Sequence, residues 1–484
     1  MPNDRNKITL GFVPANRALF SLELASKTRK EALAAMQEMG IDVVVPGESQ
    51  TKAGCVENLA EAELCARMFR EKAVDGIVIG ACNFGDEQAA AWVVREAKLG
   101  VPILLFGAQE EAPLTRQISR RDSFCGLLSI GDALRQIGAK YSVATTPICF
   151  PSDESFRSDL DWFLRVCRVV GGIRNARYGQ LGTRPDAFWT CRFDERQLQR
   201  LGPTTVVADL SEVLSGLEKI PDSDPELVPI CKELSQYDEA SHLAKGNVTK
   251  FARLELFLKR WKKEHDIDAF AIQCWTSIQK LYGVCTCSTM SRLNDMGTPC
   301  ACETDILGAM SMHACQLASG SPAGLADWNN LHNKDKELVN LWHCGVFPTS
   351  FAKDRPKLVS HAVLVLGGAV RPENAEGVFE FEVIESPLTV ARIAQDEGEW
   401  KAVIAEGRVE DNPAETFGAY GWCRIPGLQR LYREVLLHHF PHHAAMTQAH
   451  VGNVLWEAFG KYLGLKVFHA AQETPGLYTP RLPF

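Results

Sequence analysis

Two acidic residues stand inside otherwise uncharged stretches of this chain. Glu303 follows the run TPCAC, and Asp327 lies in the segment GLADWNN. Carboxylates rarely enter a protein interior unless a cation, a hydrogen-bond donor or a metal ion pairs them. A helical run separates the two acids, so the pattern predicts one carboxylate at each end of a helix. Such a pair indicates metal binding or proton transfer.

Histidines gather near the end of the chain. Six of the 12 fall in the last 47 residues: His438, His439, His442, His443, His450 and His469. Imidazole is the commonest protein ligand of metal ions and titrates near neutral pH. The alternative is that these rings stabilise the negative end of a helix dipole or lie hydrogen-bonded in the core.

The two acids and one C-terminal histidine together predict a mainly oxygen-rich metal site. Two carboxylates and an imidazole suit Mn²⁺ or Mg²⁺ better than zinc, whose sites favour cysteine and histidine. A site with only three protein ligands also leaves positions for the oxygens of a substrate.

Cysteines offer a competing metal hypothesis. Among the 16 cysteines are the pairs Cys285/Cys287 and Cys300/Cys302, each a C-x-C pattern. Structural zinc sites usually use a C-x₂₋₄-C spacing, so this pattern favours buried thiols over a zinc site or a catalytic thiol. The G-x-S-x-G and H-E-x-x-H motifs of serine hydrolases and metalloproteases are absent.

Residues 1–150 alternate between short apolar runs and helical patterns, which predicts a parallel sheet with helices on both faces. The expected strands are 8–13, 42–45, 76–81, 101–106 and 141–144, and the expected helices include 22–39, 57–70 and 87–98. No G-x-G-x-x-G follows the first strand, so a dinucleotide site is unsupported. The loop 80–86 lies at a strand end where such sheets bind ligands, although a plain turn explains it equally well.

Residues 151–345 predict a second α/β domain, and residues 346–484 predict an antiparallel β domain, either a sandwich or a barrel. The central domain has expected strands at 204–208 and 268–274 and helices at 159–170, 211–220 and 248–265, with a solvated Gly/Arg-rich loop at 171–185. The last domain has expected strands at 361–367, 377–384, 389–394 and 400–406, followed by helices at 428–439 and 451–462.

The length, composition and net charge of the chain limit which classes of protein it can belong to. The chain has 484 residues, 46% of them apolar and 23% charged, which is typical of a globular protein of several domains. A net charge of −8 argues against nucleic acid or an anionic membrane as a partner. No apolar run is long enough to span a bilayer, and the N-terminal residues lack the apolar core of a signal peptide. These features, with many unpaired cysteines, predict a cytoplasmic protein.

At these residues the chain resembles the L-fucose isomerase / L-arabinose isomerase family, most closely its shorter L-fucose isomerase-like members. The likeness covers most of the chain and is strongest in SRLNDMGTPCACETDILGAM and PHHAAMTQAHVG, with ADWNN at the family's separation from the first segment. By this match the metal ligands carry over to Glu303, Asp327 and His443. A shift of one residue would select His442 instead, and His450 is the trailing histidine.

The resemblance implies an intramolecular oxidoreductase of carbohydrate metabolism that interconverts an aldose and its ketose through an enediol. Glu303 and Asp327 would then both bind Mn²⁺, or Mg²⁺ or another divalent cation, and transfer protons. The family's architecture is two α/β domains followed by a β domain. Its members form homo-oligomers, hexamers or similar, in which a neighbouring subunit lends residues to the sugar pocket. Arg17, Asn83 and Phe84 are the nearest matches to those residues.

Further sugar contacts are expected from side chains near the two acids. Gln273 and Asn329 carry amides that can bind hydroxyl groups, and the Trp275 indole can cover an apolar sugar face. The substrate itself stays open, because family members act on L-fucose, D-arabinose, L-arabinose and related sugars. Two alternatives are a sugar-binding or sensing protein without turnover, and a metal-dependent epimerase or lyase.

Overall fold

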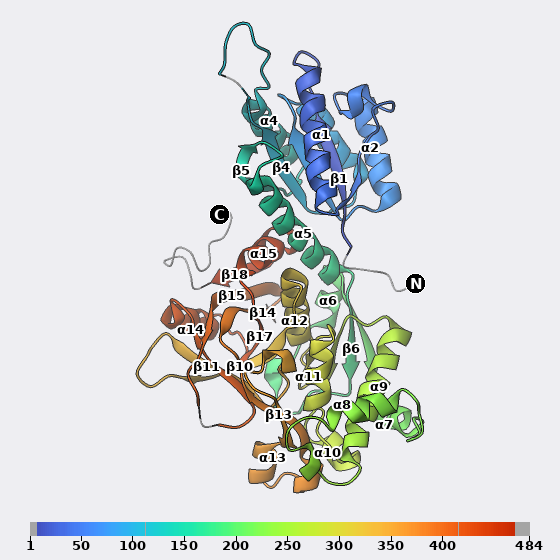
Figure 1. The fold of residues 1–484 in the computed structure, drawn as a ribbon, viewed down its shortest axis with the longest axis vertical. Helices are drawn as coiled ribbons and strands as arrows, with labels where there is room; N and C mark the ends of the chain where they lie inside the picture. The colour runs from blue at the N-terminus through green and yellow to red at the C-terminus, as the bar shows by residue number, and fades with distance from the viewer. Residues whose placement is uncertain (1–6, 112, 415, 470–484) are drawn as a thin grey trace. The chain divides into compact units, whose positions relative to one another are not determined.

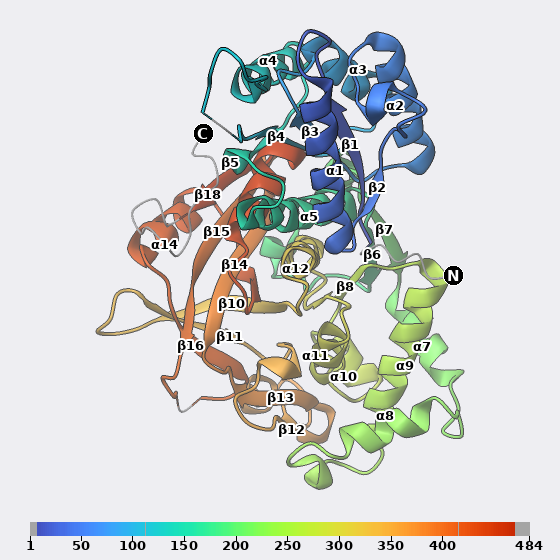
Figure 2. The same ribbon diagram turned by 45° about the horizontal axis from the view of Figure 1, so that its top comes forward.

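The computed structural model describes residues 7–111, 113–414 and 416–469. The sequence predicts no signal peptide at the N-terminus. Residues 1–6 of that segment lie outside the described residues. The chain divides into two compact units, Met1–Gly172 and Ile173–Phe484. Figures 1 and 2 show the helices and strands of both units.

Unit 1 contains a five-stranded parallel sheet in the order β2-β1-β3-β4-β5. Its strands are β1 (Thr9–Ala15), β2 (Asp42–Val44), β3 (Gly76–Ala81), β4 (Ile103–Ala108) and β5 (Ser142–Cys149). Its helices are α1 (Leu22–Glu38), α2 (Leu59–Lys72), α3 (Glu87–Ala97), α4 (Ser123–Gln136) and α5 (Glu154–Arg174). The predicted parallel α/β class is confirmed for this unit, because its strands are apolar on both faces, as a sheet covered by helices requires.

Unit 2 begins with a four-stranded parallel sheet in the order β7-β6-β8-β9. Its strands are β6 (Arg177–Leu181), β7 (Thr204–Ala208), β8 (Ala269–Ile272) and β9 (Cys300–Ala301). Its helices are α6 (Glu195–Leu201), α7 (Leu210–Glu218), α8 (Leu227–Leu234), α9 (Asn247–His265), α10 (Ser277–Leu281), α11 (Cys287–Asp295) and α12 (Ile306–Ser319). The predicted second parallel-sheet region is therefore confirmed.

The predicted loop at 171–185 is wrong, because it contains the inner strand β6. Tyr178 and Leu181 are buried there, and the strand pairs with both β7 and β8. A Cβ atom at Gly179 would meet the rings of Phe270 and Trp261 at less than 3 Å. The glycine that suggested a loop is therefore required for close packing inside the sheet.

The rest of unit 2 is built around an antiparallel barrel. Six strands pair in a closed ring: β10 (Gly324–Leu331), β11 (Leu338–His343), β16 (Ala419–Arg424), β15 (Glu399–Glu410), β14 (Ser386–Asp396) and β17 (His443–Thr447). The strands β12 (Lys357–Ser360), β13 (Glu376–Glu382) and β18 (Lys466–His469) extend this sheet. The predicted antiparallel, barrel-like region is confirmed; β10 and β11, which precede residue 346, already belong to it.

Short helices connect the barrel strands. They are α13 (Ala362–Leu366), α14 (Leu428–Leu437) and α15 (Gly452–Trp456), which continues as the π-helical segment Glu457–Leu463. Single 3-10 turns lie at Lys52–Gly54, Trp189–Cys191, Ala240–His242, Thr349–Phe351 and Pro372–Asn374. The predicted strand at 361–367 is wrong: Leu364 is buried, but Val363 and Leu366 are exposed, so the apolar run has no second sheet face to cover.

Helix α12 joins the two sheets of unit 2. It packs on β8 and β9 of the parallel sheet and on β14 and β17 of the barrel. Nearly all of its side chains are buried, as expected for a helix that is apolar all round. Glu303 lies just before this helix and Asp327 lies in β10, the strand that follows it, so both acids are held at the junction between a parallel sheet and a barrel.

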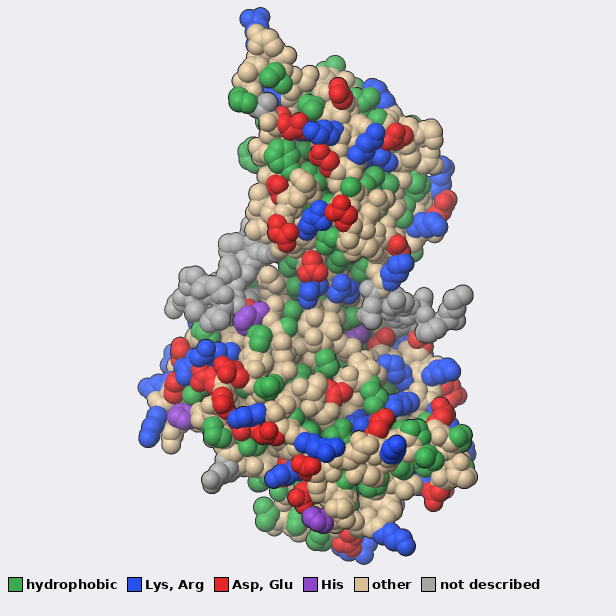
Figure 3. All heavy atoms as spheres, viewed as in Figure 1, with side chains coloured by type: hydrophobic (Ala, Val, Ile, Leu, Met, Phe, Trp, Pro, Cys, Tyr) green, Lys and Arg blue, Asp and Glu red, His purple; other side chains and the backbone are tan. Residues whose placement is uncertain are grey.

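One face of the surface carries side chains of mixed charge, with apolar side chains among them (Figure 3). Acidic and basic side chains are interspersed across the face shown in Figure 3. Among the described residues, no helix combines the length and the apolar character that crossing a membrane requires.

Candidate active site

Glu303 lies in a tight turn between β9 and α12. Glu303 and Thr304 both have left-handed backbone conformations, with φ of 60° and 57°. The Thr304 amide donates to the Ile272 carbonyl at 3.1 Å, and the Asp305 amide donates to the Cys302 carbonyl at 3.1 Å. A β-branched residue rarely adopts positive φ, and such strain gathers at functional sites. The turn therefore directs the Glu303 carboxylate, which is only 5% exposed, toward the barrel.

Asp327 and His443 meet across two neighbouring barrel strands. In the antiparallel pairing of β10 with β17, these two residues stand directly opposite each other. The His443 Nε2 atom lies 3.5 Å from Asp327 Oδ1 and 3.3 Å from Glu303 Oε2. Strand register thus brings together three side chains that the sequence spreads over more than a hundred residues.

A buried ion pair orients the His443 ring. Asp305 caps α12 through the Gly308 amide at 2.9 Å. Its carboxylate also accepts two hydrogen bonds from Arg392, at 2.5 and 3.0 Å, and one from His443 Nδ1 at 2.8 Å. Burial alone would raise the pKa of Asp305, but Arg392 and His443 hold that pKa well below its usual range. The ionised carboxylate keeps a proton on Nδ1 and directs Nε2 toward Glu303 and Asp327, where a bound cation would displace any proton on Nε2.

Two carboxylates, from Glu303 and Asp327, face the space that these atoms share. Within the described part of the chain, Glu303 and Asp327 form ion pairs with His442 and His443 but with no lysine or arginine. Asp327 Oδ1 and His443 Nε2 are buried and have no hydrogen-bond partner. Burial would lower the pKa of His443, but Asp305, Cys191 and Glu303 raise it well above the usual value. A divalent metal ion could take the place of the ring proton on Nε2, and two carboxylate oxygens with one imidazole nitrogen are a donor set that fits such an ion.

The geometry also separates the two adjacent histidines. His442 Nε2 lies 3.6 Å from Asp327 Oδ1, but its side chain is 47% exposed. Burial and the neighbouring His443 ring lower the pKa of His442 to about 4. His443 is 1% exposed, contacts both acids and has a carboxylate on its second ring nitrogen. The geometry therefore favours His443 as the ligand.

Sequence patterns did not single out His343, which ends strand β11. Its Nδ1 accepts a hydrogen bond from the Cys344 amide at 2.8 Å, while its buried Nε2 has no hydrogen-bond partner. A nitrogen of this ring lies within 4.8 Å of ligand atoms of Asp327 and His443. Burial lowers the pKa of His343, but Cys344 and Asp327 raise it to about 9. His343 is thus a third imidazole at the same site.

Asp305, Arg392 and Cys191 were also missed. Cys191 is buried, and its Sγ lies 4.0 Å from Glu303 Oε2. A sequence signal existed only for Asp305, an acid directly before an apolar helical run, which is the typical position of a helix cap.

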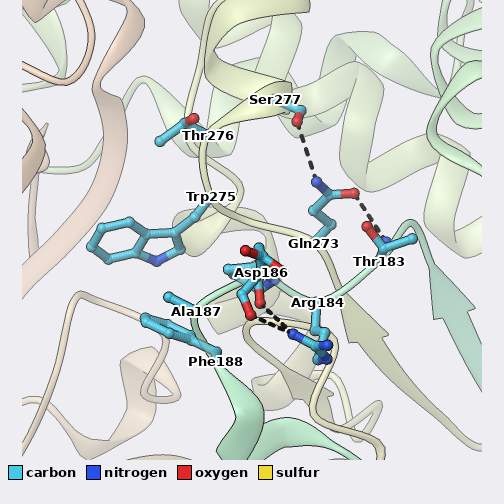
Figure 4. A pocket seen from close by; sticks show the side chains of 10 residues that line it. Thr183, Arg184, Asp186, Ala187, Phe188, Gln273, Trp275, Thr276 and Ser277 are labelled. Carbon is cyan, nitrogen blue, oxygen red and sulfur yellow. Dashed lines mark hydrogen bonds between the residues drawn. The ribbon is translucent and has the colours of Figure 1, made fainter.

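Two of the predicted sugar contacts line one pocket. Gln273 and Trp275 border an open pocket of about 800 Å³, together with Thr183, Arg184, Pro185, Asp186, Ala187, Phe188, Thr276 and Ser277 (Figure 4). Gln273 accepts from the Thr183 amide at 3.0 Å and donates to Ser277 at 3.2 Å. Between Gln273 and Trp275 lies Cys274, whose Sγ is within 4.8 Å of a Glu303 oxygen. The pocket therefore adjoins the acid site, at the carboxyl ends of β6 and β8.

The other two predicted contacts in unit 2 lie elsewhere. Asn329 is exposed on β10, beside a register shift in its pairing with β11. His450 is exposed beyond the end of β17, and its Nε2 contacts the Gly407 carbonyl at 2.9 Å. The structure does not bring either residue to the pocket lining.

Arg17, Asn83 and Phe84 form a cluster of their own in unit 1. The Arg17 amide donates to Asn83 Oδ1 at 3.0 Å, and the Arg17 guanidinium lies 4.5 Å from the centre of the Phe84 ring. Asn83 is fully buried, and its side chain also bonds Asn16, Gly85 and Ser21. Asn83 therefore shapes this loop, whereas Arg17 and Phe84 are partly exposed.

Both ends of the chain match domains of known isomerases. Residues 11–174 match the model of the fucose/sulfoquinovose isomerase N-terminal domain, and residues 341–470 match that of the L-fucose isomerase C-terminal domain. A sulfoquinovose isomerase of Priestia megaterium is 23% identical over 411 residues, which cover 83% of this chain and 86% of the relative. A sulfoquinovose isomerase of Alkalicoccus urumqiensis is 23% identical over 399 residues, which cover 81% and 85%.

Among solved structures, an ABC transporter periplasmic solute binding protein from Actinobacillus succinogenes with bound D-allose covers 64% of this chain and 91% of its own. It is 9% identical with a TM-score of 0.17, a likeness too weak to bear on fold or function. The domain matches at both ends of the chain and the relatives that span most of its length confirm the resemblance found in the sequence. This chain is an aldose–ketose isomerase that belongs to the fucose/sulfoquinovose isomerase family.

Proposed function

We propose that Glu303, Asp327 and His443 hold one divalent cation, Mn²⁺ or Mg²⁺, and that this site interconverts an aldose and its ketose through an enediol. The supporting observation is the convergence of His443 Nε2 on both carboxylates, at 3.3 and 3.5 Å, while Asp305 holds the opposite ring nitrogen. Two carboxylate oxygens and one neutral imidazole nitrogen form a mainly hard donor set.

The reaction moves one proton between neighbouring carbons of the sugar. When bound, the cation supplies Lewis acidity to the two adjacent oxygens of the open-chain sugar. One carboxylate removes the proton from C2 and returns it to C1. We assign this transfer to Glu303, which is 5% exposed against 17% for the Asp327 side chain, because enclosure protects the held proton from exchange with water. Asp327 then remains the second carboxylate ligand of the cation.

A metal-dependent epimerase or lyase would use the same first step. Both begin with loss of a proton next to a carbonyl, so the acid pair does not separate them from an isomerase. A sugar-binding protein would need neither the acid pair nor His443. Product analysis separates the three, since isomerisation alone forms a ketose of unchanged composition.

Chelation tests the metal requirement. Treatment of the purified protein with EDTA followed by gel filtration is expected to reduce ketose formation by at least about 100-fold, because the open-chain oxygens lose their Lewis acid. Added Mn²⁺ should restore it, and Ca²⁺ should restore less, because its larger radius prefers six to eight oxygen ligands. Full activity in a preparation shown by mass spectrometry to contain no metal would contradict the proposed site.

The substrate is proposed from the relatives and the pocket. The curated relatives are sulfoquinovose isomerases, and sulfoquinovose is an aldose that carries a sulfonate. Arg184 lines the pocket beside Glu303 and, in the described chain, forms no ion pair; one guanidinium nitrogen donates to the Pro185 and Asp186 carbonyls, at 2.9 and 2.7 Å. We propose that the pocket takes the distal end of the sugar and that Arg184 binds an anionic group there.

A panel of aldoses with Mn²⁺ tests this proposal. We expect kcat/KM to be highest for sulfoquinovose among sulfoquinovose, L-fucose, D-arabinose and D-glucose. Arg184→Gln should raise KM for the sulfonated sugar about 10-fold or more and leave KM for neutral aldoses unchanged, because one charge-assisted hydrogen bond contributes about 1.5–3 kcal/mol. Arg200→Gln, on the exposed end of α6, is the matched control. An equal effect of Arg184→Gln on charged and neutral sugars would contradict the assignment.

The homo-oligomer with intersubunit sugar pockets, implied by the family resemblance, stays a prediction. In such an assembly, the partly exposed Arg17 and Phe84 of unit 1 are the candidate residues that would enter the sugar pocket of a neighbouring subunit.

A further inference from the structure

Four buried cysteines converge behind the acid site, each from a different element. Cys274 follows β8, Cys302 follows β9, Cys287 begins α11 and Cys344 follows β11. All four are at most 5% exposed. We call these four residues the thiol cluster. It takes one cysteine from each C-x-C pair of the sequence, and the partners Cys285 and Cys300 instead bond backbone carbonyls.

The thiol cluster consists of two close pairs of sulfur atoms, and Cys302 and Cys344 link the pairs. Cys302 Sγ lies 2.9 Å from Cys274 Sγ, and Cys287 Sγ lies 3.8 Å from Cys344 Sγ. Cys302 Sγ, Cys344 Sγ and a nitrogen of His343 all lie within 4.8 Å of one another. Tetrahedral zinc with Zn–S bonds near 2.3 Å holds its sulfurs about 3.8 Å apart. The Cys287–Cys344 pair has this separation, and the Cys274–Cys302 pair would open by roughly 0.9 Å.

Packing alone explains this arrangement poorly. Thiols are weak hydrogen-bond donors, and cysteines used only as small apolar residues gain little from being placed sulfur to sulfur. A thiophilic cation, by contrast, binds several sulfur atoms at these separations and displaces their protons.

We propose that Cys274, Cys287, Cys302 and Cys344 form a second metal site, which binds Zn²⁺ or a similarly thiophilic ion. Binding exchanges the thiol protons for four metal–sulfur bonds and releases the protons to solvent. Thiolate ligands select soft or borderline ions, whereas the neighbouring carboxylates select hard ones, so the two sites take different metals. The site is closed to solvent, as structural zinc sites are.

The thiol cluster also has a consequence for the acid site. Cys302 directly precedes Glu303, and Cys344 directly follows His343. A metal ion bound to both sulfurs would tie the strained Glu303 turn to the end of β11. This structural role does not depend on which sugar is isomerised or on whether the acid site holds a metal.

Metal analysis of the full chain tests the proposal. Protein produced with zinc in the medium, gel-filtered after mild EDTA treatment, should retain about one zinc per chain by mass spectrometry. Cys287→Ser and Cys344→Ser should each lose it, while Cys300→Ser, a buried cysteine of the same strand region outside the thiol cluster, should retain it. Retention of full zinc in both cluster variants, or its absence from the wild-type chain, would overturn the proposal.

A second measurement needs no variant and so avoids the risk of misfolding. Wild-type chain produced with Co²⁺ in place of zinc in the medium should show a sulfur-to-cobalt charge-transfer absorption, which carboxylate and imidazole ligands do not produce. Absence of that band would overturn the proposal. So would a peptide map of non-reduced protein in which Cys274 and Cys302 are joined and lighter by two hydrogens, because a disulfide would leave only two thiols for a metal.

Discussion

Glu303→Gln is expected to lower kcat for ketose formation by about 1,000-fold, within the range that general acid–base catalysis contributes. Glutamine keeps the size and shape of the side chain but cannot take the C2 proton, and it offers a weaker oxygen ligand. The fold should survive, because Glu303 has no lysine or arginine partner among the described residues.

Two readouts distinguish this result from a general loss of structure. Exchange of the C2 proton in D₂O should fall together with ketose formation, while thermal unfolding stays cooperative. Glu382→Gln is the matched control, since Glu382 lies in the same unit on β13, near Lys353 at 3.8 Å, and should keep wild-type turnover. A Glu303→Gln protein with more than a tenth of wild-type kcat would remove Glu303 from the proton-transfer role.

Asp305→Asn is expected to cause the largest loss of stability, about 3–5 kcal/mol. Asp305 and Arg392 are both almost fully buried, and asparagine would leave the guanidinium as an uncompensated charge. The same change removes the carboxylate that holds His443 Nδ1, so metal affinity should fall by about 10–100-fold. Chemical denaturation measures the first effect, and titration of metal-free protein with Mn²⁺ measures the second.

Excess Mn²⁺ should recover most of kcat in Asp305→Asn. If Asp305 served only to stabilise the fold, added metal would not restore kcat. The double variant Asp305→Asn/Arg392→Met should lose less free energy of unfolding than the two single variants lose together, because it removes both charges of the pair. Its metal affinity should stay low. Asp295→Asn, at the surface end of α11, is the control. Unchanged Mn²⁺ affinity in Asp305→Asn would show that this carboxylate does not position His443.

The stability from Asp305 also depends on pH. Arg392 and His443 hold the pKa of Asp305 below its usual range against the effect of burial, so the folded state favours the ionised form. The stabilisation is therefore present above the unfolded-state pKa of about 3.9 and is lost as the pH falls toward the folded-state value.

Local patterns in the sequence were sufficient for the fold class and for half of the acid site. Alternating apolar and helical segments predicted the parallel sheets, because β strands buried on both faces require continuous apolar runs. Glu303 and Asp327 stood out because a carboxylate in an apolar run needs a partner. The pattern failed at β6 and α13, where glycine and arginine concealed an inner strand and β-branched residues formed a short connecting helix.

Only the tertiary structure showed which other residues join the two acids to form the site. The pairing of β10 with β17 sets His443 opposite Asp327, and Arg392 reaches Asp305 from β14. The C-x-C spacing argued against a metal, yet folding separates each pair and joins Cys287 and Cys302 with Cys274 and Cys344. The physical reason is the same in each case. Strand register and helix docking set distances between residues far apart in the chain, and local spacing carries no information about those distances.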